Sequence, residues 1–135
     1  MGETVGMDGM EGGGDTLVLD ENGLNARIGL HALPDADMLA LGFRDCGDRW
    51  YCVRAVGLAS GCHWLTLNVT VPKDGARGRI DVLDECFCQP YDYQRILMDD
   101  PRNGCASAVR DDVEREMARL ADAGVVSGHV PGEYV

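Results

Sequence analysis

The chain has 135 residues, the length of one domain and enough to bury a core without a metal or a disulfide. Its 23 Asp and Glu against 12 Lys and Arg give a formal net charge of -11, which repels a phosphate backbone and argues against direct nucleic-acid binding. No run approaches the ~20 apolar residues of a membrane helix, and the first residues lack a signal-peptide pattern. We therefore expect a cytoplasmic protein without membrane association, whose cysteines are mostly free thiols.

The N-terminal region has too little apolar surface to fold. Residues 1–15 contain six glycines and four acids, so we predict a flexible glycine-rich tail. Residues 16–135 are then expected to form a single α+β domain. Two strand-like segments open it, over residues 16–19 and 26–32, with turn residues between them.

A β-hairpin is predicted over residues 37–57, with Cys46 and Gly47 at the centre of a two-residue turn. This register pairs Phe43 with Trp50 across the hairpin. The next strand, residues 62–71, alternates between two faces, and turn residues 72–78 lead into a strand over residues 79–87. Its apolar face is predicted to carry His63, Leu65, Leu67, Val69 and Val71. Consecutive strands with short turns predict an antiparallel β-meander.

Two C-terminal helices are predicted to pack on one face of this sheet. The first has Pro90 in its first turn and ends before Pro101. The second runs from about Cys105 to Ala123 and is followed by Gly124, a good C-cap. Its apolar stripe is formed at helical spacing by Val109, Val113, Met117 and Leu120. The remaining residues, from 125 on, are predicted to add an edge strand or to lie on the surface.

The stretch "ECFCQPYDY" contains two cysteines one residue apart, Cys86 and Cys88. In a strand their side chains share the face of Ile80 and Val82, so we interpret them as buried thiols that act as small hydrophobic groups. A metal site is the alternative, and it would need Cys86, Cys88, Cys62 and His63 to come together through the fold. The spacing is not that of the usual zinc knuckles.

No catalytic constellation is evident. Cys62 and His63 would leave opposite faces of a strand, so they cannot form a nucleophile and base there. Ser60 does not fit the nucleophile-elbow pattern, and the glycines do not have phosphate-loop or dinucleotide-binding spacing. We therefore expect a non-enzymatic protein without a cofactor. A small cysteine-dependent or metal-dependent enzyme and a structural zinc module remain the alternatives.

The stretches "RIDVLDECFCQPYDYQ" and "LADAGVVSGHVPGEYV", within residues 79–134, resemble small uncharacterised accessory proteins carried on conjugative elements and phages of Gram-positive gut bacteria. The resemblance covers about the last 55 residues and brings no catalytic or ligand motif with it. It implies a setting in which small proteins regulate transfer or block host defences, including CRISPR effectors, by binding another protein.

Charge and resemblance together favour an acidic binding protein from a mobile element. Its partner would be a protein with a basic nucleic-acid-binding surface, and an inhibitor of anti-CRISPR type is the sharpest form of this hypothesis. Acids on one helix and two tyrosines expected to be exposed are the candidate contacts. The predicted partner-binding residues are Asp111, Asp112, Glu114, Glu116, Tyr91 and Tyr93. The oligomeric state is left open.

Overall fold

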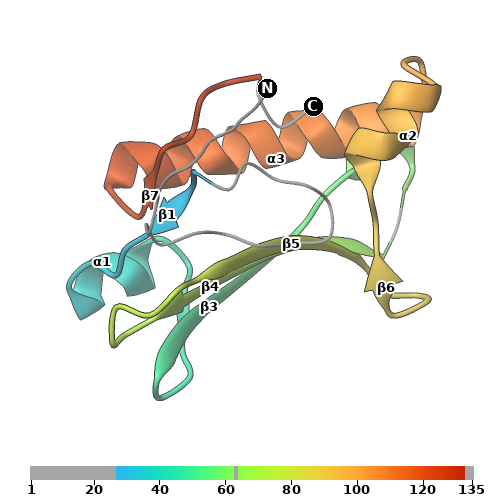
Figure 1. The fold of residues 1–135 in the computed structure, drawn as a ribbon. Helices are drawn as coiled ribbons and strands as arrows, with labels where there is room; N and C mark the ends of the chain where they lie inside the picture. Colours follow the sequence, from blue (N-terminus) through green and yellow to red (C-terminus); the bar gives the residue numbers. More distant parts are fainter. Residues whose placement is uncertain (1–26, 63, 133–135) are drawn as a thin grey trace.

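A computed structural model of the chain describes residues 27–62 and 64–132. The predicted tail over residues 1–15, the segment 16–19 and His63 lie outside the described residues. The α+β class predicted from the sequence is confirmed: an antiparallel sheet is accompanied by helices, with the longest helix near the C-terminus (Figure 1).

The main sheet has five strands in the order β2-β3-β4-β5-β6. Neighbouring strands of this sheet are consecutive in the chain and pair antiparallel. This is the predicted meander. The strands are β2 (Arg44–Asp45), β3 (Arg49–Ala55), β4 (Leu65–Pro72), β5 (Arg79–Asp84) and β6 (Gln89–Pro90).

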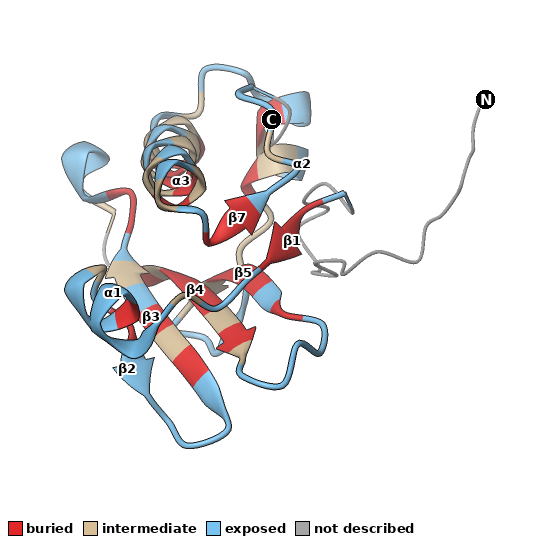
Figure 2. Cartoon of the chain, turned by 90° about the vertical axis from the view of Figure 1, so that its left-hand side faces the viewer, coloured by how far each residue is buried: buried red, intermediate tan, exposed pale blue. Residues whose placement is uncertain are grey.

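The helices and a small second sheet complete the described fold. The C-terminal helices α2 and α3 lie on the same side of the main sheet, as predicted (Figure 1). Helix α1 lies near the β2 edge of this sheet (Figure 2). Strands β1 and β7 pair antiparallel in the second sheet. These elements are β1 (Gly29–Leu30), α1 (Asp35–Ala40), the 3-10 turn η1 (Leu58–Ser60), α2 (Tyr93–Asp99), α3 (Gly104–Ala123) and β7 (Val126–Ser127).

The core lies between α3 and the sheet. All four residues of the predicted helix stripe are buried, and Figure 2 shows buried positions on α3 and at intervals along the strands. The side chain of Asn103 caps the first turn of α3 by accepting from the Ala106 N–H, and Gly124 ends the helix in the left-handed region at φ 94°. Local sequence signals therefore determine where this helix begins and ends, and its apolar stripe determines which side of the helix faces the sheet.

The predicted hairpin begins too early and has the wrong register. Residues 35–40 form α1 rather than a strand. The strands pair Asp45 with Trp50, and the Cys46 N–H donates to the Arg49 carbonyl. The turn is therefore centred on Gly47 and Asp48, because Gly47 has a φ of 92° and its N–H donates to the Asp45 side chain.

The strand predicted over residues 79–87 ends at Asp84. The Asp84 carboxylate accepts hydrogen bonds from the N–H groups of Cys86 and Phe87, which closes a loop over residues 85–88. The chain then returns as β6, so Pro90 lies in a strand and pairs with Leu83. The prediction that Pro90 begins a helix is wrong; α2 begins three residues later, after the Asp92 cap.

Candidate interaction surface

The main sheet has one face that turns away from α2 and α3, which we call the outer face (Figure 1). Because side chains alternate along a strand, the residues next to the core positions in β3, β4 and β5 point to this side. The cross-strand register places them in adjoining rows. They are Arg49, Tyr51, Val53, Ala55, Thr66, Asn68, Thr70, Pro72, Arg79, Asp81 and Leu83.

A chain of hydrogen bonds occupies the middle of the outer face. The Tyr51 hydroxyl donates to Asn68 Oδ1, Asn68 Nδ2 donates to Thr66 Oγ1 at 3.0 Å, and the Thr66 hydroxyl donates to Glu85 Oε2 at 2.7 Å. Burial raises the pKa of Tyr51, and the charges of Asp81 and Glu85 raise it further. Tyr51 is therefore a neutral donor at physiological pH, and the connected side chains are held in fixed positions.

Asp81 is a charged group on the outer face that is nevertheless buried, with only 8% of its surface exposed. Its Oδ2 accepts from Arg79 Nε at 2.6 Å, while its Oδ1 is buried without a hydrogen-bond partner. A buried carboxylate oxygen that lacks a donor costs free energy. The pair with Arg79 compensates the charge and orients the guanidinium along this face.

Two large aromatic side chains are exposed where β4 begins and where β5 turns into β6. Trp64 is 68% exposed and Phe87 is 71% exposed. The backbones are joined here, because the Glu85 N–H donates to the Trp64 carbonyl at 2.6 Å. We call Trp64, Asp84, Glu85 and Phe87 the aromatic end; it carries two acids and no base. Exposed aromatic side chains of this size are typical anchors of protein interfaces.

The opposite end of the outer face holds a groove of about 380 Å³. It lies beside the turns that join β2 to β3 and β4 to β5. We call it the arginine groove, because three of its lining residues are arginines. The lining residues are Asp48, Arg49, Thr70, Pro72, Asp74, Ala76, Arg77 and Arg79.

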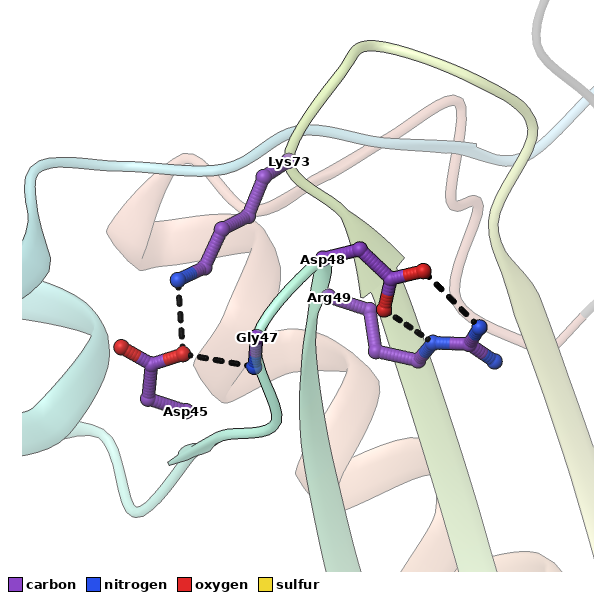
Figure 3. Close-up of polar contacts among 5 residues, drawn as sticks. All are labelled: Asp45, Gly47, Asp48, Arg49 and Lys73. Carbon is purple, nitrogen blue, oxygen red and sulfur yellow. Dashed lines mark hydrogen bonds and ion pairs between the residues drawn. The ribbon is translucent and has the colours of Figure 1, made fainter.

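Ion pairs hold the hairpin tip next to this groove (Figure 3). Lys73 donates to Asp45 at 2.6 Å and lies over the Trp50 ring at 4.7 Å from its centroid. Asp48 accepts two hydrogen bonds from the Arg49 guanidinium. These bonds lower the pKa of Asp45, through Lys73 first and then the Gly47 N–H, and the bond from Arg49 lowers the pKa of Asp48. The tip therefore stays ionised and ordered at neutral pH.

The α3 acids predicted to contact a partner do not all lie in water. Asp111 does, with 60% of its side chain exposed. Asp112, Glu114 and Glu116 are only 23%, 22% and 21% exposed. The Asp112 carboxylate accepts from the Gly57 N–H at 2.8 Å, Glu114 accepts from a backbone N–H, and Glu116 accepts from an arginine on the same helix. Three of the four acids named as candidate contacts are therefore largely covered and already bonded within the chain.

The two tyrosines predicted to be exposed are not. Tyr93 is fully buried, because α2 begins at this residue and turns it into the core. Tyr91 is half-buried and packs against the core, and burial raises its pKa. The prediction of an exposed tyrosine pair is therefore wrong.

Cys86 and Cys88 are exposed, so their assignment to the core is wrong; the strand ends before it reaches them. Cys52 is the buried free thiol, and its burial raises its pKa. Cys62 and Cys105 form a disulfide that joins the segment after η1 to the first turn of α3. Across residues 27–62 and 64–132, no group of three or more His, Cys, Asp or Glu side chains is arranged to hold a metal ion.

The outer-face residues were missed as a site although the sequence carried part of the signal. Trp64 belongs to the polar face of the predicted strand, and a tryptophan among threonine and asparagine indicates an exposed aromatic. Phe87 was missed because β5 was predicted to continue to residue 87. Arg49, Arg77 and Arg79 lie together because of the turn between β4 and β5, and no local sequence pattern predicts this grouping.

In the described part of the chain, no helix is both long enough and apolar enough to cross a membrane. No family model matches the sequence, and no curated protein matches it either. Among solved structures, the fold is similar to the crystal structure of a DUF1831 family protein from Lactobacillus plantarum. The TM-score is 0.56 at 10% sequence identity, over 73% of this chain and 82% of that one. At this identity the likeness concerns the fold alone.

Proposed function

We propose that this chain is a non-enzymatic binding protein that recognises another protein through the aromatic end, where β4 begins and β5 turns into β6. The observation that carries the proposal is the exposure of Trp64 and Phe87, at 68% and 71%, in two segments that a backbone hydrogen bond joins. Large aromatic side chains release much apolar surface from water when a partner covers them, and they dominate interface energetics.

Charge indicates the kind of partner. The aromatic end carries Asp84 and Glu85, and the whole chain has a net charge of -11. Such a surface attracts a basic partner and speeds encounter with it. We propose a protein that handles nucleic acid, because its basic surface would be complementary. Inhibition of a host defence complex, in the manner of an anti-CRISPR protein from a mobile element, is the sharpest form of this proposal, and the sequence resemblance supports it.

The test compares two aromatic variants with a matched control. The immobilised protein is incubated with host lysate, and captured proteins are identified and then challenged with nucleic acid and with rising salt. W64A and F87A should each lose the captured partner, whereas M98A should keep it, since Met98 is 82% exposed but lies on α2. Nucleic acid should compete with this chain for the partner. A partner that is retained by both aromatic variants and is indifferent to nucleic acid would overturn the proposal.

A cysteine-dependent or metal-dependent protein is the second candidate. Cys86 and Cys88 favour it, because both thiols are exposed in one short loop. Thiolates are good ligands for soft metals and good nucleophiles. Mass spectrometry of the native purified protein distinguishes the candidates: a stoichiometric bound zinc that is lost in C86S and C88S would support the second one.

A further inference from the structure

We propose that Cys86 and Cys88 bind one soft metal cation, copper(I), in the loop that joins β5 to β6. Both thiols are free and exposed. Thiolates are the ligands that copper(I) selects. The inference deepens the second candidate function, on whose two thiols it rests, and it does not depend on the proposed protein partner.

The two thiols are close enough in the chain to share one ion. The Cα atoms of residues two positions apart are separated by at most about 7 Å in an extended chain, and residues 85–88 form a turn, which shortens the separation. With a metal–sulfur distance of about 2.3 Å, as in zinc thiolates, two thiolates on one ion lie at most about 4.6 Å apart. Because both side chains are exposed, they can rotate to this separation without disturbing the core.

Hydrogen bonds hold the loop in shape before any ion binds. The Asp84 carboxylate accepts from the Cys86 N–H at 2.9 Å, and Asp84 pairs with Gln89 across the hairpin. The Cys88 thiol donates to the Glu85 carbonyl at 3.8 Å. Cys88 also has a φ of 54°, a conformation that costs free energy for a residue other than glycine. Backbone strain of this kind is concentrated at functional sites.

The charges around the loop favour a cation. Asp84 and Glu85 precede the thiols, and residues 84–90 include no Lys, Arg or His. Binding replaces two thiol protons by one ion, so two protons are released and the ion offsets part of the negative charge of the thiolate pair. The same acids and the net charge of -11 repel an anionic oxidant such as glutathione disulfide. Cation binding is therefore favoured over disulfide exchange at this loop.

The available ligands select a soft ion with a low coordination number. Structural zinc takes four ligands, whereas residues 27–62 and 64–132 contain no group of three or more His, Cys, Asp or Glu side chains placed to hold a metal. The Asp84 carboxylate is engaged by loop N–H groups, and the Glu85 carboxylate accepts from the Thr66 hydroxyl. Carboxylates also suit hard ions rather than soft ones. Two thiolates are sufficient for copper(I), which accepts linear two-coordinate binding.

The experiment is a competition titration of the full chain without oxygen. Copper(I) is supplied as its complex with bicinchoninate, a coloured chelator, and the loss of colour measures transfer of the ion to the chain. One ion per chain should bind, and X-ray absorption should show two sulfur neighbours. C86S and C88S should each weaken the affinity by more than about 100-fold, because loss of an outer-shell group alone costs about 10–100-fold.

C46S is the matched control, because Cys46 is also a free, exposed thiol and lies in the turn between β2 and β3. It should bind copper(I) as the parent chain does. A thiol count on the unfolded chain should give four free cysteines, which shows that the disulfide between Cys62 and Cys105 is intact. Circular dichroism confirms that each variant is folded.

The outcomes separate this inference from the proposed function. Loss of binding in C86S and C88S but not in C46S supports copper(I) at this loop. Unchanged binding in C86S or C88S, an equal loss in C46S, or one ion shared by two chains would overturn it. A stoichiometric zinc held by both thiols would support the second candidate function and overturn the choice of copper(I). A chain that takes no copper from the chelator overturns this inference alone, because the capture test with W64A and F87A does not involve the thiols.

Discussion

Two neighbouring acids on α3 allow the structural role of the acidic residues to be measured. Asp112 accepts a hydrogen bond at 2.8 Å from the N–H of Gly57, a buried residue at φ 78° in the segment that leads into η1. Asp111 is exposed and pairs with Arg110, its neighbour on the helix. We predict that D112A is strongly destabilising and that D111A is not, although the two changes remove the same group from adjacent positions of one helix.

The expected loss of stability depends on the Gly57 N–H, which loses its acceptor in D112A. D112A leaves the Gly57 N–H buried without an acceptor, which costs about 1–3 kcal/mol, and the exposed pair with Arg115 adds about 0–1 kcal/mol. D111A should stay within about 0.5 kcal/mol of the parent chain. Both variants gain the same helix propensity, so their difference isolates the hydrogen bond.

Urea unfolding monitored by circular dichroism measures this difference as a shift of the midpoint at constant slope. D112N should recover part of the loss, because an asparagine oxygen can still accept from the Gly57 N–H. Equal midpoints for D111A and D112A would refute the reasoning, because they would show that Asp112 contributes no more to stability than an exposed acid.

Two further predictions concern titration and thiol reactivity. The pKa of Tyr51 is raised by burial, so the folded state holds this proton more tightly than the unfolded state; stability should be full below about pH 10, the ordinary tyrosine pKa, and fall as the pH rises above it. Y51F should remove part of that alkaline loss, and an unchanged alkaline profile in this variant would contradict the assignment. A maleimide reagent should label Cys46 and Cys86 rapidly and Cys52 slowly, since Cys52 is buried with a raised pKa; peptide mapping after short exposure checks this order, and early labelling of Cys52 would show that the core opens.

The sequence predicted the elements that are specified locally. In α3 the apolar spacing from Val109 to Leu120 and the glycine at position 124 act within the helix itself, and the structure reproduces both its span and its buried stripe. The alternation in β4 is equally local, with Leu65, Leu67 and Val69 buried as predicted. Patterns of this kind need no knowledge of distant residues.

The errors occur where one side chain decides between two structures. Asp84 turns the chain because its carboxylate accepts hydrogen bonds from the next two N–H groups, those of Cys86 and Phe87. These apolar residues continue the alternation of a strand in the sequence, but they lie in an exposed loop. Met38 is buried by the short helix α1 rather than by a strand. The partner of Asp112 is 55 residues away in sequence, and no pattern around α3 could have identified it.

The charges near the two ends of β4 differ: Asp84 and Glu85 belong to the aromatic end, and arginines that are partly paired with carboxylates line the groove at the other end. From Leu65, next to the aromatic end, to Thr70, in the arginine groove, β4 advances five residues, or about 17 Å at the usual strand rise. Electrostatic interactions between exposed charges are screened beyond about 8 Å at physiological ionic strength. If the proposed basic partner binds at the aromatic end, it therefore meets Asp84 and Glu85 with little influence from the arginines of the groove. Such a placement of charge contributes more to specificity than to affinity.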